Sequence, residues 1–519
     1  MNEITTISAN GRQAAVVRDW GRVGACGLEI RRRAPHDAEG PFLLGLAQKA
    51  ARKPTIAAQY FSQALELSAD RYDAAIELAF LYVLLNRHAE ANELLDRHQE
   101  LLANSPKYLD LAGQTYSRMG MYDEAWPLYE RANQLQPDVE VLQANMAACA
   151  VYLGKISEAS AIYTRLLTKH PAHQRNHYEL AQLERATNDN HVKQMLAALK
   201  KADPKPAKNI FLYYALAKEF EDLGRWDEAF DYYQRGGDAV RTTMVYDVAT
   251  DTAVIDKIIE VCTSGWLAKD PVCDESARTP IFVVGLPRTG TTLTDRILSC
   301  HSRVASIGET QFLHMVLRRN SGLQTDGELT ADVVEAARQL SAGEIAQGYM
   351  DAASHRLGDA PFFIDKLPEN VLHLGFIAKA WPRARIIHLR RNPMDACFAM
   401  YKQSFFRFAY SLDDLAEYYL AYDRLSRHWR NVLVGRMIEV EYEQLVSDQE
   451  RQTRRLLEAL GLPFEEACLH FEQNTAPIAT ASSVQVREKV HTRSVNKWKK
   501  FERQLGPLRE RLEAGGVKI

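Results

Sequence analysis

The chain has 519 residues, of which 46% are hydrophobic and 25% are charged, a balance typical of globular proteins with two or more domains. Its formal net charge of −3 provides no basic field that would attract nucleic acid, so we expect no nucleic-acid partner. The sequence contains no run of about 18 uncharged apolar residues, so we predict no transmembrane segment.

The first residues, MNEITTISANGRQAAVVRDW, lack the basic-then-apolar pattern of a secretion signal. The seven cysteines are scattered and form no C-x-x-C pair, which disfavours zinc and dithiol chemistry. An odd, scattered set of this kind fits reduced thiols. We therefore expect a cytoplasmic protein.

Three kinds of residue recur at intervals of 34 in the first half of the chain: Ala57, Ala91, Ala125 and Ala159; Gly120 and Gly154; Pro137 and Pro171. A period of 34 is typical of tetratricopeptide repeats, each of which is a helical hairpin. The small residues let two helices approach closely, and the proline ends the second helix. Generic amphipathic helices are the alternative, but they rarely repeat four alanines in register.

The segment from Leu109 to Pro137 resembles the tetratricopeptide family, which it matches at Gly113, Tyr116, Ala125, Tyr129, Ala132 and Pro137. We predict about six repeats between residues 40 and 236, preceded by a helical segment at 1–39. The resemblance implies a concave surface that binds peptides or proteins. Two other uses stay open, namely forming a homodimer and bracing the second half.

Residues 237–277 are predicted to be a helical linker that ends in a loop, and residues 278–519 a second domain. Short β-branched runs begin there at residues 281, 362 and 385, each followed by a helical pattern. Strand–helix alternation predicts a parallel sheet covered by helices. The expected fold is thus a helical solenoid followed by a P-loop-like α/β domain.

The run PIFVVGLPRTGTTLTDRILSCH, which begins at Pro280, reads as a strand, a glycine-containing turn and a helix start. The pattern is that of the phosphate-binding loop G-x-x-x-x-G-K-[ST], except that Thr291 stands in the lysine's place. Backbone N–H groups of such a turn and the positive end of the helix bind anions, and Arg288 can replace the missing cation. A glycine turn without a ligand is the simpler alternative.

The string from Pro287 to Leu293 resembles the 5′-phosphosulfate loop of the sulfotransferase family, whose donor is 3′-phosphoadenylyl sulfate (PAPS). The resemblance implies that the donor is bound by Arg288, Thr289, Gly290, Thr291, Thr292 and Leu293. It also implies that no metal is required, because the donor has no triphosphate to hold. An ATP-dependent phosphotransferase would need a lysine and a magnesium carboxylate, and Asp295 lies on the wrong side of the loop for that role.

Glu309, in ASIGETQF, lies 21 residues after Arg288, where a second strand or turn would return to the loop. The matching glutamate in the protein-tyrosine sulfotransferase branch of the family is the catalytic base, so the resemblance implies this role for Glu309. A surface glutamate is the alternative. His301 aligns with a helix-end histidine of the same branch, and we interpret it as structural.

Lys366, in FFIDKLPEN, follows a strand-like run. It resembles the family's lysine that contacts the bridging oxygen of the donor, so the resemblance implies that it stabilises the leaving phosphate together with Arg288. The alternative for Lys366 is a salt bridge with Asp365 or Glu369.

In ARIIHLRRNPMDACFAMY, a strand ends in Arg390 and Arg391 before a helix begins. Ligands bind at such carboxyl ends of strands in α/β sheets, although a solvated turn is the alternative. The resemblance implies that Arg391 binds the donor's 3′-phosphate. The family's serine, eight residues further on, is replaced by Ala399. Losing that hydroxyl costs about 1 kcal/mol, so we expect weakened or rearranged donor binding.

Two later segments complete the resemblance. IEVEYEQLVSD resembles the strand that carries the adenine-contacting tyrosine, here Tyr442, for which an ordinary strand tyrosine is the alternative. Residues 482–498 match the late loop of the protein-tyrosine branch without a gap, although Arg487, Glu488 and Lys489 depart from it. The match implies that Ser483 lies beside the reacting sulfate and that Lys497 contacts the cofactor. A solvated basic surface is the alternative.

The resemblance therefore predicts a sulfotransferase that moves a sulfuryl group from PAPS to an acceptor hydroxyl and releases 3′-phosphoadenosine 5′-phosphate. Its chemistry would be carried by Glu309, Arg288, Lys366 and Ser483. The expected acceptor is a tyrosine of a peptide or protein bound through the repeats, and a carbohydrate or small molecule stays open. A non-catalytic scaffold with an inactive nucleotide fold is the other alternative, and Ala399 favours it.

Overall fold

The computed structural model describes residues 3–102, 104–269, 278–323, 328–480 and 482–519. The chain divides into two compact units, Met1–Leu153 and Gly154–Ile519. Most of the loop predicted between the two halves lies outside the described residues. Among the cysteines within the described ranges, none forms a disulfide.

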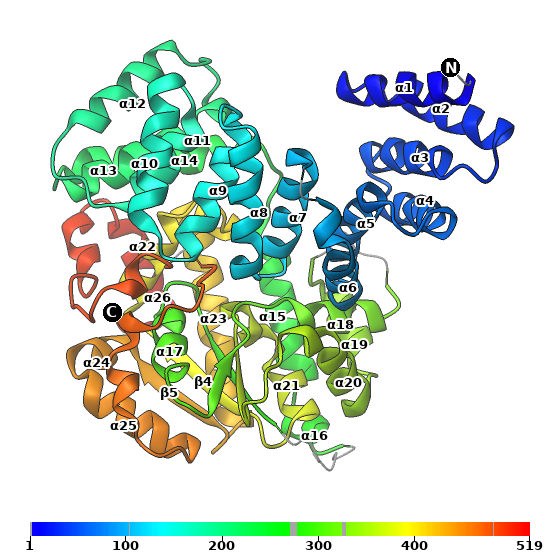
Figure 1. The fold of residues 1–519 in the computed structure, drawn as a ribbon. Coiled ribbons are helices and arrows are strands. Elements are labelled where there is room, and N and C mark those ends of the chain that lie inside the picture. Colours follow the sequence, from blue (N-terminus) through cyan, green and yellow to red (C-terminus); the bar gives the residue numbers. More distant parts are fainter. Residues whose placement is uncertain (1–2, 103, 270–277, 324–327, 481) are drawn as a thin grey trace. The chain divides into compact units, whose positions relative to one another are not determined.

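The first unit is helical, and most helices that follow one another in the chain pack side by side (Figure 1). Gly113 shows why they approach closely, since a Cβ atom there would lie 2.9 Å from the ring of Tyr129 on the paired helix. The elements are α1 (Glu3–Val16), α2 (Trp20–Arg33), α3 (Glu39–Ala50), α4 (Pro54–Leu67), α5 (Tyr72–Leu84), α6 (His88–His98), η1 (Gln99–Leu102), α7 (Pro106–Arg118), α8 (Tyr122–Leu135) and α9 (Glu140–Tyr152).

The second unit begins with five more helices of the predicted repeat region. They are α10 (Ile156–Lys169), α11 (Gln174–Leu183), α12 (Asn190–Lys201), α13 (Ile210–Asp222) and α14 (Trp226–Arg241), with η2 (Pro206–Lys208) before α13. Helices α3 to α14 thus cover the stretch in which the six repeats were predicted. The alanines that recur every 34 residues are fully buried, one each in α4, α6, α8 and α10: Ala57, Ala91, Ala125 and Ala159.

The second unit contains a five-stranded parallel sheet with helices around it (Figure 1). Its strands are β1 (Thr279–Gly285), β2 (Val304–Ser306), β3 (Phe362–Lys366), β4 (Arg385–Arg390) and β5 (Met437–Glu441), in the order β2-β3-β1-β4-β5. Every pairing is parallel, so the carboxyl ends of all five strands lie on one edge of the sheet. We call this edge the carboxyl edge.

Helices cover both faces of the sheet, and alternate residues of β1 point to opposite faces. Phe282 and Val284 belong to one core cluster, and Ile281 and Val283 to another. The second unit also contains α15 (Val248–Val261), α16 (Ser264–Leu267), α17 (Thr291–Leu298), α18 (Phe312–Asn320), α19 (Ala331–Ala337), α20 (Ala342–Ala353), α21 (Leu374–Ala380), α22 (Pro393–Tyr401), α23 (Leu412–Val432), α24 (Tyr442–Ser447), α25 (Gln449–Leu460) and α26 (Gly506–Ala514).

Short 3₁₀ helices connect these elements: η3 (Ser354–Arg356), η4 (Pro368–His373), η5 (Arg407–Ala409), η6 (Glu466–Leu469), η7 (Phe471–Gln473), η8 (Gln485–Arg487) and η9 (Lys497–Phe501). The runs predicted as strands at residues 281, 362 and 385 are β1, β3 and β4. One placement differs from its prediction, because Tyr442 starts α24 instead of lying on a strand. The reason is that β5 ends beside the last residue of β4, where Glu441 pairs with Arg390 and the chain leaves the sheet.

The last repeat hairpin shares its core with the sheet. Leu212 and Phe220 of α13 and Tyr233 of α14 belong to the same buried cluster as Phe282 of β1 and Phe398 of α22. Helix α14 also runs to Arg241, beyond residue 236, where the repeats were predicted to end. The hairpin α13–α14 is thus built into the compact unit that carries the sheet.

Candidate active site

The glycine turn after β1 has a backbone shape that few residues other than glycine adopt. Gly285 has a φ of 150° and Gly290 a φ of 101°, and Arg288 between them has a φ of 66°. A Cβ atom on Gly290 would lie 2.7 Å from the ring of Tyr442. Gly290 is also the N-cap of α17, so the turn leads directly into the positive end of that helix. Such a turn is an anion-binding concavity.

The side chains that follow in the turn are largely buried. Thr289 Oγ1 donates to the carbonyl of Leu286 at 2.6 Å, which closes the turn on itself. Thr291 and Thr292 are buried at the start of α17, where the first backbone N–H groups of a helix have no partner within the helix. The side chain of Leu293 packs into the core cluster that contains Ile281 and Val283 of β1. The hydroxyls of Thr289 and Thr292 are thus bonded within the protein, the latter to Thr480 Oγ1 at 3.4 Å, and the donors that the turn offers are the first backbone N–H groups of α17.

Arg288 reaches from the turn to the late loop that was predicted to be part of the site. Its Nη1 donates to Ser482 Oγ, and its Nη2 donates to Gln485 Oε1 at 2.8 Å. Its Nε is buried and has no hydrogen-bond partner among the described residues. Burial and the neighbouring Arg391 guanidinium lower the pKa of Arg288 to about 10. Arg288 is therefore still a cation at neutral pH, in a place where an anion would be stabilised.

Arg391, directly after β4, joins the same turn to two other predicted donor-binding segments. Its Nη1 donates to the carbonyl of Arg288 at 2.8 Å, and its Nη2 donates to the carbonyl of Ser494 at 2.6 Å. Its guanidinium carbon lies 4.7 Å from the centroid of the Tyr442 ring. Its buried Nε, like that of Arg288, has no hydrogen-bond partner within the described ranges. The turn, Arg391 and Tyr442 thus form one cluster.

Lys366 and Glu309, predicted separately, form an ion pair. Lys366 is the last residue of β3 and is 1% exposed, and its Nζ bonds Glu309 Oε1. Glu309 follows β2, and its side chain is 34% exposed. The backbone N–H of Lys366 donates to the carbonyl of Gly308 at 3.0 Å, which holds the two segments together. A buried cation thus meets an accessible carboxylate at the carboxyl edge.

Asp365 fixes the segment that carries this pair. It is fully buried and accepts hydrogen bonds from Thr310 Oγ1 and Tyr349 Oη, both at 2.7 Å, and from Asn370 Nδ2 at 3.1 Å. Burial raises the pKa of Asp365 to about 6, even though these bonds and nearby cations oppose the shift. Because Thr310 follows Glu309 directly, Asp365 links β3 to the turn that carries the predicted base.

The late loop is partly buried. Ser483, Val486 and Trp498 are buried, and the guanidinium of Arg487 packs against Gly154. Of the two neighbouring serines, it is Ser482 that bonds Arg288. The loop is therefore packed into the unit at these positions, which disfavours the alternative of a solvated surface.

Lys497, predicted to contact the cofactor, bonds a carboxylate that sequence reasoning missed. Its Nζ pairs with Glu221 Oε1, on the repeat helix α13. Lys402, just beyond α22, pairs with the same carboxylate oxygen at 2.9 Å. Glu221 lies in an ordinary helical stretch, and no pattern in that stretch indicates partners so far along the chain. Ala399 lies on α22, one turn before Lys402.

His301 has both ring nitrogens engaged with the chain. Its Nε2–H donates to the carbonyl of Pro463 at 3.0 Å, and its Nδ1 accepts from the backbone N–H of Arg303 at 3.1 Å. It is also almost fully buried. This arrangement favours a structural role, because neither nitrogen faces the loop that contains Arg288.

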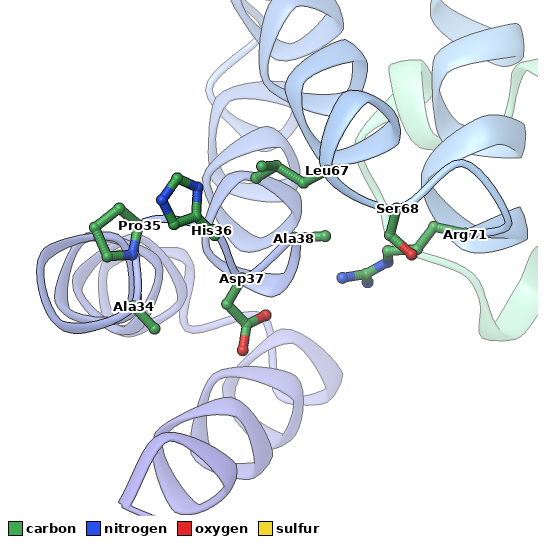
Figure 2. Close-up of a pocket in the computed structure, with 8 residues that line it drawn as sticks. All are labelled: Ala34, Pro35, His36, Asp37, Ala38, Leu67, Ser68 and Arg71. Atoms are coloured by element: carbon green, nitrogen blue, oxygen red, sulfur yellow. The ribbon is translucent and has the colours of Figure 1, made fainter.

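A surface pocket lies elsewhere, within the first unit (Figure 2). It is lined by Ala34, Pro35, His36, Asp37, Ala38, Leu67, Ser68 and Arg71. None of the predicted site residues lines it, and the guanidinium of Arg71 is bonded to Asp73 and Glu39. Within the described ranges, no cluster of three or more histidine, cysteine or acidic side chains could hold a metal ion. The described helices are all too short or too polar to cross a membrane.

Comparisons with known proteins agree with both halves of this architecture. Residues 280–466 match the model of the sulfotransferase family, and residues 49–114 match a tetratricopeptide repeat. The chain thus combines tetratricopeptide repeats with a sulfotransferase-family region.

Relatives extend these matches. An uncharacterized protein of Aquifex aeolicus is 28% identical over 426 residues, which cover 80% of this chain and 56% of that protein. The protein-tyrosine sulfotransferase of Drosophila melanogaster is 25% identical over 231 residues, which cover 42% of this chain and 46% of that protein. The chain therefore spans about half the length of these two relatives. A solved sulfotransferase domain from the curacin biosynthetic pathway is 17% identical, covers 47% of this chain and 99% of its own, and has a TM-score of 0.35.

Proposed function

We propose that the chain is a sulfotransferase that moves a sulfuryl group from PAPS to the hydroxyl of a tyrosine in a peptide or protein. The observation that carries the proposal is the ion pair of Lys366 and Glu309 at the carboxyl edge that also bears Arg288 and Arg391. The carboxylate can take the proton of an acceptor, and the cations can offset the charge of the phosphates and the sulfuryl group. The family match and the protein-tyrosine sulfotransferase relatives support the same reaction.

The residues present fit a nucleotide with two separate phosphates. The turn from Gly285 to Thr292 would take the 5′ end, because its backbone and Arg288 form an anion site. Arg391 would take the 3′-phosphate, and the ring of Tyr442 beside it would stack on the adenine. The buried Nε atoms of Arg288 and Arg391, which bond no described residue, are donors that such an anion would satisfy. Ala399 supplies no hydroxyl, so the 3′ side depends on cations.

Glu309 takes the acceptor's proton as the acceptor oxygen bonds the sulfur. The bond between the sulfur and the bridging phosphate oxygen breaks in the same step. Lys366 and Arg288 offset the negative charge that the departing phosphate gains, and they act strongly because the lysine is buried. Before the reaction, the ammonium of Lys366 holds Glu309 as an oriented carboxylate. Ser483 and Ser482 border the sulfuryl group from the late loop.

The test is transfer from ³⁵S-labelled PAPS to a panel of tyrosine peptides, simple phenols and sugars. We expect label on a tyrosine hydroxyl, and at least a 100-fold lower rate for Glu309→Gln, since general-base catalysis contributes about 10²- to 10⁴-fold. The affinity of this variant for 3′-phosphoadenosine 5′-phosphate should stay within about threefold of the wild type. Transfer to sugars alone would replace the tyrosine assignment.

A matched control is Glu465→Gln. The side chain of Glu465 is 29% exposed, close to the 34% of Glu309, but it bonds Ser302 and lies next to His301. This variant should keep its rate. Absence of transfer to any acceptor, with nucleotide binding intact, would instead support the scaffold alternative, and a Glu309→Gln variant with full activity would remove the assigned base.

A further inference from the structure

The last repeat hairpin is fastened to the sulfotransferase-family region by aromatic side chains. Phe230 and Tyr233 of α14 lie against α22, with ring centroids 5.7 Å from Tyr401 and 6.3 Å from Phe398, respectively. Trp226 packs edge-on against Phe501 at 5.5 Å. Contacts of this kind between buried rings fix the distance between two elements. Side chains of the hairpin that reach beyond this interface therefore have defined positions relative to α22, the helix that follows Arg391.

Glu221 is the charged side chain that α13 brings to this interface. It is 5% exposed, and its Oε1 bonds both Lys402 and Lys497, while Tyr233 Oη donates to its Oε2 at 3.0 Å. Burial alone would raise the pKa of Glu221, but the two ammonium groups reverse that effect and lower it to about 2. Glu221 is consequently a carboxylate across the whole pH range in which the protein would work.

The two lysines around Glu221 differ in their surroundings. Lys402 is the inner one, with a side chain that is 17% exposed, and burial lowers its pKa to about 8. Lys497 is the outer one, and its side chain is 34% exposed. One carboxylate and two ammonium groups leave this cluster with one positive charge in excess. A buried cluster with such an imbalance is suited to an anionic ligand.

The backbone of Lys497 is held from the other side. Asp395, in the first turn of α22, accepts hydrogen bonds from the backbone N–H groups of Asn496 at 2.6 Å and Trp498 at 2.9 Å. The main chain on both sides of Lys497 is therefore anchored to α22, which follows Arg391. Only the side chain of Lys497 is left to be directed, and the group that directs it comes from the repeats.

We propose that Glu221, on the repeat helix α13, is a positioning residue of the nucleotide site. Its carboxylate holds the ammonium group of Lys497 toward the donor, while Lys402 balances the buried negative charge of Glu221. The inference rests on the proposed function, because Lys497 has a ligand to contact only if the site binds a nucleotide. An ammonium group has three N–H donors, so Lys497 can bond Glu221 and a phosphate together. The last repeat hairpin is then part of the site.

The test is a double-mutant cycle on nucleotide affinity. Calorimetry with 3′-phosphoadenosine 5′-phosphate is run on the full chain, on Glu221→Gln, on Lys497→Met and on the double variant. Because Lys497→Met removes a hydrogen bond to a charged group, we expect its nucleotide affinity to be about tenfold weaker than that of the wild type. For Glu221→Gln we expect the affinity to be about fivefold weaker. The double variant should bind within about twofold of Lys497→Met, because both changes remove the same contact.

Two results would overturn the inference. If the single losses multiply in the double variant, Glu221 does not act through Lys497. If Glu221→Gln binds as tightly as the wild type or more tightly, the carboxylate only competes with the nucleotide for the ammonium group. A wild-type chain that binds no nucleotide would be a different failure, because it would contradict the proposed function itself.

Glu219→Gln is the matched control. Glu219 is a second buried carboxylate on α13, but it bonds His191 Nδ1 at 2.5 Å, within the repeats. This change should lower stability and leave the nucleotide affinity within about twofold of the wild type. An equal loss of affinity in Glu219→Gln would mean that any loosening of α13 suffices, which also contradicts the inference.

Tyr233→Phe serves if Glu221→Gln does not fold. It keeps the ring against Phe398 and removes only the hydrogen bond to Glu221. We expect the nucleotide affinity of Tyr233→Phe to be about threefold weaker than that of the wild type. In a chain that already carries Lys497→Met, Tyr233→Phe should have no further effect on affinity. Unchanged affinity in Tyr233→Phe would count against the inference.

Discussion

Two charge clusters, one in each compact unit, both join carboxylates to cations but differ in the balance of charge. In the first unit, Arg12 and Arg71 bond Glu39 and Asp73, so two cations meet two carboxylates. In the second unit, Glu221 alone meets Lys402 and Lys497. The first cluster is neutral and complete within the repeats, whereas the second keeps a positive charge. A balanced cluster ties helices together, and an unbalanced one leaves a charge for a ligand.

The largest expected effect comes from the cation at the carboxyl edge. Lys366→Met should lower kcat about 100- to 1,000-fold, because it removes the buried charge that offsets the leaving phosphate. Transfer from ³⁵S-labelled PAPS measures kcat, and calorimetry with the product nucleotide measures affinity. Affinity should fall much less than kcat.

Lys379→Met provides the comparison for that variant. Lys379, on α21, is also a buried lysine of the second unit, but its ammonium nitrogen lies 4.5 Å from the centroid of the Trp266 ring. It should keep its kcat. Equal losses of kcat and affinity in Lys366→Met would assign that lysine to binding alone.

Asp365 sharpens the contrast, because it is a fully buried acid whose pKa is raised even though cations and hydrogen-bond donors lie near it. Its pKa of about 6 exceeds the ordinary value of 3.8, so between those values the folded protein keeps a proton that the unfolded chain has lost. The free energy of unfolding therefore falls as pH rises from about 4 to about 6, by roughly 3 kcal/mol from this group. Urea unfolding at stepped pH should show a flatter profile for Asp365→Asn. Parallel profiles for the two proteins would contradict the shift.

The balanced cluster should respond in stability alone. Asp73→Asn weakens its bonds with Arg12 and Arg71, so we expect a loss of about 2 kcal/mol in the free energy of unfolding. Nucleotide affinity should not change, because the cluster holds repeat helices to one another. Asp70 is an exposed neighbour whose carboxylate accepts a hydrogen bond from Ser68, and Asp70→Asn should cost much less. Weaker nucleotide binding in Asp73→Asn would break the distinction between the clusters.

Local patterns in the sequence predict most of the architecture. The buried alanines at intervals of 34 predict the repeats, and the turn between Gly285 and Gly290 predicts the strand, the loop and the helix that follow. Both signals are local, since a glycine or alanine is required wherever another element approaches closely. The pairing of Lys366 with Glu309 was not predicted, although each residue had been assigned to the site on its own.

Other features depend on contacts between distant segments. Glu221 and Lys402 are 181 residues apart, and neither stands in a pattern that marks it. Tyr442 was expected on a strand, but the chain leaves the sheet one residue earlier. The repeat pattern did not predict that the last hairpin shares its core with the sheet. The reason is that the pattern depends only on how the helices of a repeat pack against each other.

A crystal structure of the chain with 3′-phosphoadenosine 5′-phosphate tests the central claim most directly. The 5′-phosphate should lie about 3 Å from backbone N–H groups of the turn between Gly285 and Thr292, with Arg288 beside it and Arg391 on the 3′-phosphate. A nucleotide bound elsewhere in the second unit, with that turn making no contact to phosphate, would contradict the account.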